Sequence, residues 1–355
     1  KKHGGHEKKR LEKIHETSKK LVDILADQNL ILKTSTSKSE IDKFHSLFLG
    51  STDGSFQITG GVAGTWYIPV SASIVYFPDG FWGPVKVHLP KPEIIKKEET
   101  EEVNISRYAE TLMMLLELKA MRIFRNIVPS NVTAYLIIDG PIIDPPWLFD
   151  EKYIKERAST ILSNYQGKNR IITVGFVKRI LGSYFVNYLT DKNLVESKIL
   201  EEYSSDFNLV LPVLTNAYGK ICSEKNDVVF TKPLEFPVST TGDRDKLPLI
   251  YKKYRDEGLY VYYSYYKPNI ASTPFRLDIA FPEQPDEEEL MKITEYLIKL
   301  VKSWTVPGMN IPLPVYLAHE KCNIRKGAAD TLYLEIITRV ALPTRAPSWV
   351  NILFS

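Results

Sequence analysis

Two acidic residues stand in the same short context, an aspartate followed by a glycine after an apolar run. Gly54 follows Asp53, and Gly140 follows Asp139. Asp-Gly is also a common turn pair, so either pair alone is most simply a turn. An acid that ends a central strand, however, is costly to bury unless it is paired or bound to a metal. Two strand-end Asp-Gly pairs in one chain therefore favour a functional site.

The helix predicted between these pairs carries Glu110 and Glu117, which are seven residues apart and so on one face. Glu117 is flanked by leucines, whereas Glu110 lies one turn from Arg107. A solvated face explains either glutamate alone, but a helix packed on the strands would aim one of them at the two aspartates. Three carboxylates make a site for Mg²⁺ or Mn²⁺. Two such ions activate water and stabilise the leaving oxygen of a phosphodiester, which is nuclease chemistry.

A histidine late in the chain is a further candidate. His319 stands near the start of a predicted helix, with Glu320 beside it. A lone histidine is more often structural or exposed than a ligand. Its meaning therefore depends on where this helix docks.

The elements expected around these residues alternate between strands and helices, which favours a mixed α/β layer architecture. Apolar and β-branched runs predict strands and a period near 3.6 predicts helices. The predicted strands are 65–69, 72–77, 132–138, 171–177, 260–266, 275–281 and 332–340. The predicted helices are 7–26, 40–49, 107–125, 287–304 and one that starts near 315. The charged run 96–102 is most simply a solvated loop.

The whole-chain composition narrows the classes of protein. The 355 residues suffice for a sizeable core, and 44% hydrophobic with 25% charged residues is typical of globular proteins. A net charge of +3 does not by itself identify a nucleic-acid-binding protein. Cys222 and Cys322 lack zinc-ligand spacing, which favours a reducing, intracellular compartment. No segment reads as a membrane span or secretory signal, so we expect a cytoplasmic protein.

The domain organisation expected is one elaborated domain, 31–355, after an N-terminal amphipathic helix in 1–30. That helix has an apolar stripe, formed by Leu11, Ile14, Leu21 and Leu25, and a heavily charged opposite face. The stripe needs a surface to cover it. A partner, either a second copy or a larger assembly, is one candidate, and the chain's own core is the other.

The order of these motifs resembles that of the NurA nucleases. The matching pieces are Asp53-Gly54-Ser55 on a strand, a helix carrying Glu117, 137–141 with Asp139, a strand ending at 177–179, and 314–320 with His319. They span residues from about 50 to 325. Each piece alone is weak because Asp-Gly pairs are common, but the ordered set is moderately specific.

The resemblance implies an α/β fold with a ribonuclease-H-like core, a mixed central sheet flanked by helices, and extra insertions. It implies a Mn²⁺-dependent deoxyribonuclease, with Mg²⁺ as an alternative ion, that has 5′ to 3′ exonuclease and single-strand endonuclease activity. It further implies homodimerisation, single- and double-stranded DNA as substrates, and work with the hexameric helicase HerA in double-strand-break end resection. The residues that match the family's metal-binding and catalytic positions are Asp53, Glu117, Asp139 and His319.

Two departures from the family pattern leave alternatives open. Ile311 stands where the family usually has a tyrosine, eight residues before the histidine, and Tyr316 is the nearest substitute. The spacing from Glu117 to Asp139 is also longer than expected, so Glu110 remains a rival ligand. A weakened paralogue that acts as a DNA- or partner-binding subunit is therefore the alternative function.

Other enzyme classes and features are less well supported. The sequence has neither a phosphate-binding GxxxxGK[ST] loop nor a GxSxG nucleophile elbow, which argues against a nucleotide hydrolase or a serine hydrolase. The tyrosines of 260–266 could stack on bases, but alternating strand tyrosines are more often packing residues.

Overall fold

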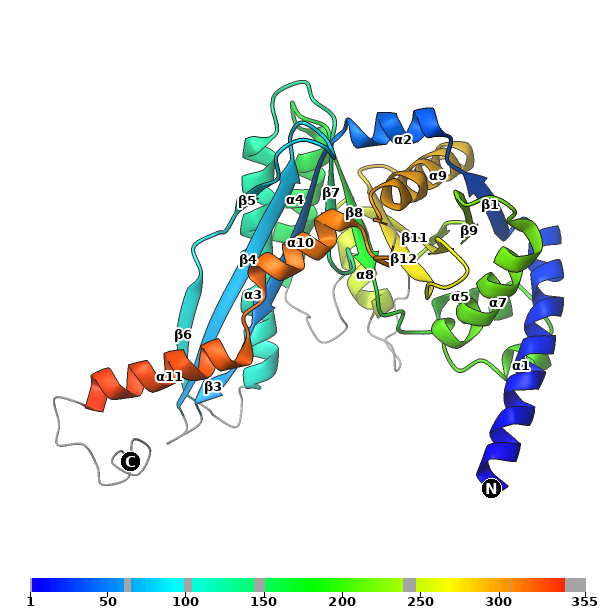
Figure 1. Ribbon diagram of the computed structural model, residues 1–355, viewed down its shortest axis with the longest axis horizontal. Helices are drawn as coiled ribbons and strands as arrows, with labels where there is room; N and C mark the ends of the chain where they lie inside the picture. Colours follow the sequence, from blue (N-terminus) through cyan, green and yellow to red (C-terminus); the bar gives the residue numbers. More distant parts are fainter. Residues whose placement is uncertain are drawn as a thin grey trace.

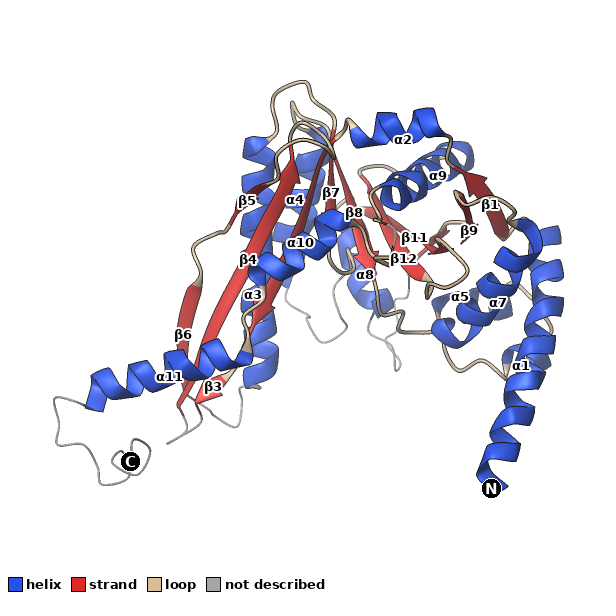
Figure 2. Ribbon diagram, viewed as in Figure 1, coloured by secondary structure: helices blue, strands red, loops and turns tan. Residues whose placement is uncertain are grey.

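The computed structural model describes residues 2–60, 65–98, 104–143, 151–238, 247–306 and 308–341 (Figure 1). The described chain has a mixed α/β fold, in which helices flank a large mixed sheet (Figure 2). None of the described helices combines the length and apolar character needed to span a bilayer.

Twelve strands of the described residues form the sheet. They are β1 (Ile31–Ser35), β2 (Phe48–Phe56), β3 (Thr59–Gly60), β4 (Thr65–Phe77), β5 (Lys86–His88), β6 (Glu93–Glu98), β7 (Ala134–Ile138), β8 (Ile171–Val177), β9 (Asp227–Thr231), β10 (Leu234–Glu235), β11 (Tyr260–Lys267) and β12 (Phe275–Phe281). The main path runs β1-β9-β11-β12-β8-β7-β2-β4-β3. Strand β7 pairs in parallel with both β2 and β8, and the other pairs along the path are antiparallel.

The helices cover both faces of the sheet. They are α1 (Lys2–Asp27), α2 (Lys38–His45), α3 (Ile105–Ile127), α4 (Glu151–Gln166), α5 (Tyr184–Asp191), α6 (Ser197–Leu200), α7 (Asp206–Ile221), α8 (Leu247–Asp256), α9 (Glu287–Ser303), α10 (Leu313–Cys322) and α11 (Lys326–Ala341). One apolar core holds residues of α1, α3, α4, α5, α7 and α8. A second core, on the opposite face, holds residues of α2, α9 and α10.

Most predicted elements are present, and four expectations are corrected. The helix predicted at 40–49 ends at His45, because the apolar residues after it begin β2. The two strands predicted in 65–77 are one long strand, β4. In the charged run 96–102, residues 96–98 belong to β6, which pairs with β4, and the remainder lies outside the described residues. The strand predicted at 332–340 lies in helix α11, where alanine, leucine and glutamate outweigh the β-branched residues.

Two further segments pack inside the chain. Leu21, Val22 and Leu25 of α1 are buried in the first core, and the side chain of Leu11 lies outside the described part. Four tyrosines of β11 are also buried, namely Tyr262, Tyr263, Tyr265 and Tyr266. The packing interpretation of this aromatic run is therefore confirmed, because buried rings are not available to stack on bases.

Candidate metal centre

Asp53 lies inside β2 and not at its end, contrary to the expectation of a strand-end acid. Its neighbour on β4 is Ser73, and its side chain is on the sheet face that α10 covers. On the other side, β7 pairs with β2 only as far as Thr52 opposite Ile138. The edge of β2 is therefore open at Asp53, which leaves room for side chains beside this carboxylate.

Asp139 comes directly after β7 and is brought beside Asp53 by the parallel pairing. Its backbone N–H donates to the carbonyl of Thr52 at 3.0 Å. Gly140 then turns the chain away with φ +151, a value that residues with a Cβ rarely adopt. The strand-end position predicted for Asp139 is thus confirmed.

His319 reaches the same place from α10. The helix is held against the sheet by the hydroxyl of Ser73, which donates to the carbonyl of Ala318 at 2.7 Å. The Nδ1 atom of His319 lies 2.8 Å from Oδ2 of Asp53. Potential ligand atoms of Asp53, Asp139 and His319 all lie within 4.8 Å of one another. We call these three residues the acid–histidine cluster.

The charges in this cluster are not balanced. Burial raises the pKa of Asp139 to about 6, and the negative charge of Asp53 adds to the effect. Lys178, just after β8, opposes it by donating to Oδ2 of Asp139 at 2.7 Å. Two carboxylates thus face one lysine and a histidine whose side chain is 48% exposed, which favours occupation by a cation.

Glu117 approaches β2 from the opposite face. Gly54 lies on the face packed by α3, and a Cβ added there would meet Oε1 of Glu117 at 2.6 Å and Cγ of Met113 at 2.6 Å. Glu117 is buried, with 7% of its surface exposed, whereas Glu110 is only half-buried. The inward direction predicted for Glu117 therefore holds. The glycine makes room for this carboxylate, although Glu117 is not among the three residues whose ligand atoms cluster.

A buried ionic network holds the segment after Asp139. Asp278 on β12 accepts the backbone N–H of Ile142 at 3.1 Å and is bound twice by Arg276, at 2.7 and 3.1 Å. Arg157 of α4 donates to the carbonyls of Ile142 and Pro141 at 3.1 and 2.9 Å. All three charged side chains are buried. Sequence reasoning missed this network, although two charges on one face of the apolar strand 275–281 were a usable signal.

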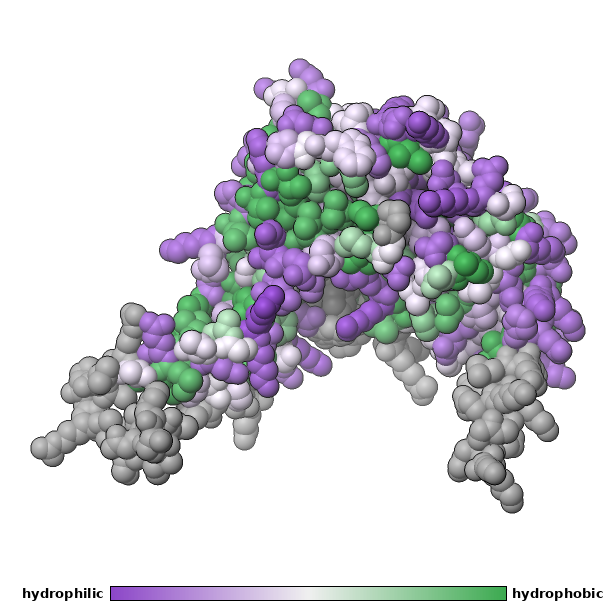
Figure 3. All heavy atoms as spheres, viewed as in Figure 1, coloured by the Kyte–Doolittle hydropathy of each residue, from purple (hydrophilic) through white to green (hydrophobic). Residues whose placement is uncertain are grey.

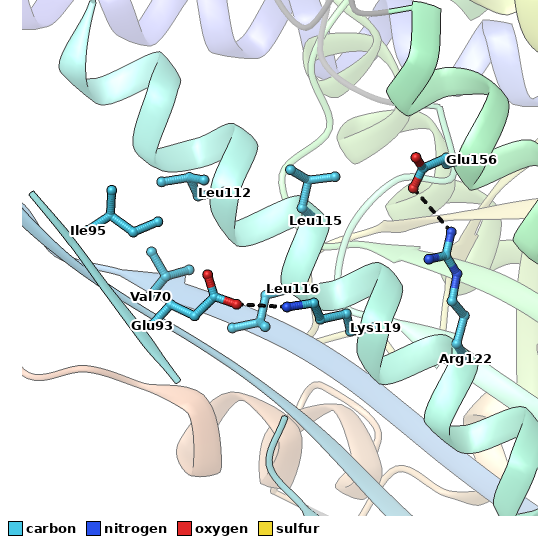
Figure 4. Close-up of a pocket in the computed structure, with 9 residues that line it drawn as sticks. All are labelled: Val70, Glu93, Ile95, Leu112, Leu115, Leu116, Lys119, Arg122 and Glu156. Carbon is cyan, nitrogen blue, oxygen red and sulfur yellow. Dashed lines mark hydrogen bonds and ion pairs between the residues drawn. The ribbon is translucent and has the colours of Figure 1, made fainter. Parts of the chain in front are cut away.

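The cavity in Figure 4 is a different place, of about 210 Å³, beside α3. Its lining is apolar apart from two ion pairs, Lys119 with Glu93 at 2.7 Å and Arg122 with Glu156 at 3.2 Å. Figure 4 shows each of these charges directed at its partner. Because they neutralise each other, this cavity lacks the unbalanced charge of the acid–histidine cluster.

The comparisons with known proteins decide the family. The NurA domain profile matches residues 12–338, nearly the whole chain. The chain belongs to the NurA family. The crystal structure of the NurA nuclease from Sulfolobus solfataricus is similar with a TM-score of 0.56 and 13% identity, covering 90% of this chain and 89% of that one. A second NurA crystal structure has a TM-score of 0.50 and 11% identity, covering 97% and 98%.

No curated protein matches the sequence. At these identities the two structures establish the fold, and the domain profile establishes membership of a nuclease family. The recognition made from the ordered motifs is confirmed. The roles of individual residues in this NurA chain rest on the geometry described above.

A thiol that the sequence did not single out as a ligand also borders the acid–histidine cluster. Cys322, three residues after His319 on α10, is buried with its Sγ 3.5 Å from Oδ2 of Asp53. Burial raises the pKa of this thiol, and the negative charges of Asp53, Glu117 and Asp139 raise it further. Cys322 is therefore a neutral neighbour.

The residues that depart from the NurA pattern occupy different environments. Ile311 is partly buried against the second core, where it packs as an ordinary apolar side chain. Tyr316 is exposed and lies three residues before His319, on the same face of α10. A tyrosine hydroxyl is therefore available on the His319 face, although from another position of the segment.

The donor atoms of the cluster fit a divalent cation. Carboxylate oxygens are the ligands that Mg²⁺ and Mn²⁺ prefer, and an imidazole nitrogen is a ligand for transition metals. Asp53, Asp139 and His319 supply this combination with their ligand atoms already grouped. The residues present therefore match a site for a divalent cation.

Proposed function

We propose that this NurA chain is a divalent-metal-dependent deoxyribonuclease. The observation that carries the proposal is the convergence of Asp53, Asp139 and His319 at the open edge of β2, in a chain of a nuclease family. A bound Mn²⁺ or Mg²⁺ would supply Lewis-acid activation of water and of a phosphodiester. The chain's own residues position the ligand atoms and set the net charge of the site.

Each residue has a distinct part in the proposal. Asp53 and Asp139 hold the cation, and His319 completes the ligand set while its contact with Asp53 orients both side chains. Glu117 is the third carboxylate, and it approaches through the space left by Gly54. Lys178 offsets the negative charge of Asp139, and it would also offset the charge of a phosphate oxygen bound beside that residue.

The finer activities follow from the resemblance and are proposed with it. They are 5′ to 3′ exonuclease and single-strand endonuclease cleavage, a preference for Mn²⁺, a ribonuclease-H-like core, and an intracellular role with a HerA-type hexameric helicase in end resection. DNA, single- or double-stranded, is the proposed substrate. The N-terminal helix, 1–30, and the remainder, 31–355, are proposed to act as one folded unit, which the burial of Leu21 and Leu25 supports.

A homodimer is proposed for the same reason, and an apolar surface supports it. Figure 3 shows apolar atoms gathered over β5 and the neighbouring end of α10. Exposed apolar side chains in and next to these elements are Val85, Val87, Leu89 and Tyr316. Contiguous apolar surface of this kind marks interaction sites. Sedimentation of wild type and Val87→Glu tests the proposal, with a monomeric variant as the expected result.

The experiment that tests the nuclease is a metal titration of cleavage. Fluorescent single- and double-stranded oligonucleotides are incubated with wild type, Asp53→Asn and the exposed-acid control Asp42→Asn over a range of Mn²⁺ and Mg²⁺. We expect metal-dependent cleavage by wild type and by the control, and at least about a hundredfold loss in Asp53→Asn. A folded wild type with no cleavage under any metal would instead favour the weakened paralogue that Ile311 suggests.

A further inference from the structure

A second polar cavity, of about 390 Å³, lies on the same sheet face as the acid–histidine cluster. Its lining residues include the C-terminal end of α9, Ile41 of α2 and the loop that leads to α10; Figure 1 shows where these elements lie. Polar residues that line it include Thr36, Lys225, Asn226, Asn269, Lys302 and Asn310, together with Ser303 and Thr305. A volume of this order is within the range of small-molecule sites.

The charge of this cavity is positive and uncompensated. No aspartate or glutamate is among its described lining residues, which include Lys225 and Lys302. Burial lowers the pKa of Lys302, and the nearby charge of Lys225 lowers it further. Lys299, three residues earlier on α9, is by contrast paired with Glu40 and Glu295 at 3.1 and 3.0 Å. Glu295, the acid nearest in the chain to Lys302, is thus already engaged.

Two neutral groups of the cavity keep a hydrogen-bond donor available, whereas Asn226, Ser303 and Thr305 donate to backbone carbonyls. Asn269 uses its side-chain oxygen to accept two backbone N–H groups at 2.9 and 2.8 Å, which leaves its amide NH₂ as a donor. The hydroxyl of Thr36 is buried without a hydrogen-bond partner among the described residues. Two ammonium groups, an amide and a hydroxyl form a set suited to the oxygens of a phosphate.

The cavity is close to the acid–histidine cluster along the chain and in the sheet. Asn310 lies three residues before α10, and His319 is in its second turn, so their Cα atoms are at most about 20 Å apart. The strand pairing agrees with this position. The turn between β11 and β12, which contains Asn269, lies beside the C-terminal end of β8, because Arg276 at the start of β12 pairs with Val177.

We propose that this cavity, which we call the Lys302 cavity, binds a phosphate group of the DNA strand away from the bond that is cleaved. The proposal rests on the proposed nuclease function, which makes DNA the substrate. A phosphate there would compensate the two lysines and anchor the strand whose reactive part extends toward His319. The same chemistry is shared by a free mononucleotide, so the test separates the two sources.

The test measures DNA binding without cleavage. Anisotropy of a fluorescent single-stranded oligonucleotide is followed in EDTA, at several salt concentrations, for wild type, Lys302→Gln, Lys225→Gln and the double variant. Lys292→Gln, which removes an exposed lysine from the same helix, is the matched control. We expect the double variant to bind about tenfold more weakly, with the slope of log K against log salt reduced by about 0.7 for each phosphate that is no longer neutralised by a lysine. The control should match wild type.

Two results would overturn the proposal. One is a folded double variant whose affinity and salt slope equal those of wild type. The other is a thermal stabilisation by adenosine monophosphate or inorganic phosphate that requires Lys302, while oligonucleotide binding does not, because the cavity then binds a free phosphate compound. Repeating the binding in Asp53→Asn separates this question from catalysis, since the proposed anchor does not need an intact metal site.

Discussion

Two groups of buried carboxylates lie close together in the sheet and differ in how their charge is matched. Asp278 on β12 accepts two hydrogen bonds from the buried Arg276 and one from the backbone N–H of Ile142. Asp139, after β7, has one partly exposed lysine and faces the carboxylate of Asp53. The charge of Asp278 is thus matched by partners within the protein. The second group is left with negative charge and ligand atoms within 4.8 Å, so the difference separates a structural site from the proposed metal site.

The largest effect is expected from breaking the complete group. Asp278→Asn leaves Arg276 buried without its countercharge, and such a loss costs roughly 3 to 5 kcal/mol in the free energy of unfolding. Urea denaturation measures it. The double variant Arg276→Met with Asp278→Asn removes the orphaned charge, so it should lose less stability than Asp278→Asn alone. Equal or greater loss in the double variant would show that the pairing is not what stabilises this region.

In the acid–histidine cluster we expect the opposite result, because removing the charge of Asp139 should raise the free energy of unfolding. The pKa of Asp139 is about 6 in the folded protein, above its ordinary value of 3.8. As pH rises, the unfolded chain therefore releases this proton first, and folding is penalised progressively between about pH 4 and pH 6. Above pH 6 the penalty is complete, at about 3 kcal/mol without metal.

Asp139→Asn should therefore stabilise the metal-free protein at pH 7 to 8 and change its stability little below pH 4. Chemical denaturation in EDTA at several pH values measures this difference. A stability gain that is the same at pH 4 and pH 8 would contradict the charge-based explanation. Loss of stability at pH 8 would indicate that Asp139, like Asp278, has a complete set of partners.

The two glutamates of α3 allow a buried carboxylate to be compared with a half-buried one on the same helix. We expect Glu117→Gln to reduce metal-dependent cleavage by roughly 10- to 100-fold, since Glu117 is buried against Gly54, the residue that follows Asp53. Glu110→Gln, on the half-buried part of the same helix, is the matched control and should cleave DNA nearly as wild type does. The reverse ranking would transfer the role to Glu110.

A smaller effect is expected at Gly54. Gly54→Ala places a methyl group at the position now bordered by Glu117 and Met113, so these side chains must move. Overpacking of this kind costs about 1 to 3 kcal/mol. Thermal melts and cleavage rates measured together give both consequences. Unchanged melting and unchanged cleavage would mean that the close approach of Glu117 to β2 is dispensable.

The sequence pattern predicted β7 and the helices that carry Glu117 and His319, and the family resemblance put Asp53 on a strand, but neither showed how their faces meet. Asp139 was identifiable because an apolar run of strand length stops at it. Asp53 was misplaced at a strand end because Gly54 looks like a turn residue, although it continues β2 and admits Glu117 from the other face. Burial depends on which helix covers each face. That information comes from pairing between segments far apart in the chain, such as β2 with β7 and α10 with β2.

The neighbours of the acid–histidine cluster could not be identified from local sequence patterns for the same reason. Lys178 and Cys322 join the site only because β8 pairs with β7 and α10 lies on β2. The strand predicted at 332–340 failed because β-branched residues there were weighed without the alanines that precede them. Ordered motifs identified the NurA family, whereas the partners of each charge required the tertiary structure.

The most direct test of the account is metal binding by the acid–histidine cluster. Binding of Mn²⁺ is measured by electron paramagnetic resonance in wild type, Asp53→Asn, His319→Gln and the control Asp42→Asn, each shown to be folded by circular dichroism. We predict that wild type and the control bind Mn²⁺ and that both cluster variants bind it at least about tenfold more weakly. Equal Mn²⁺ binding by wild type and Asp53→Asn would contradict it.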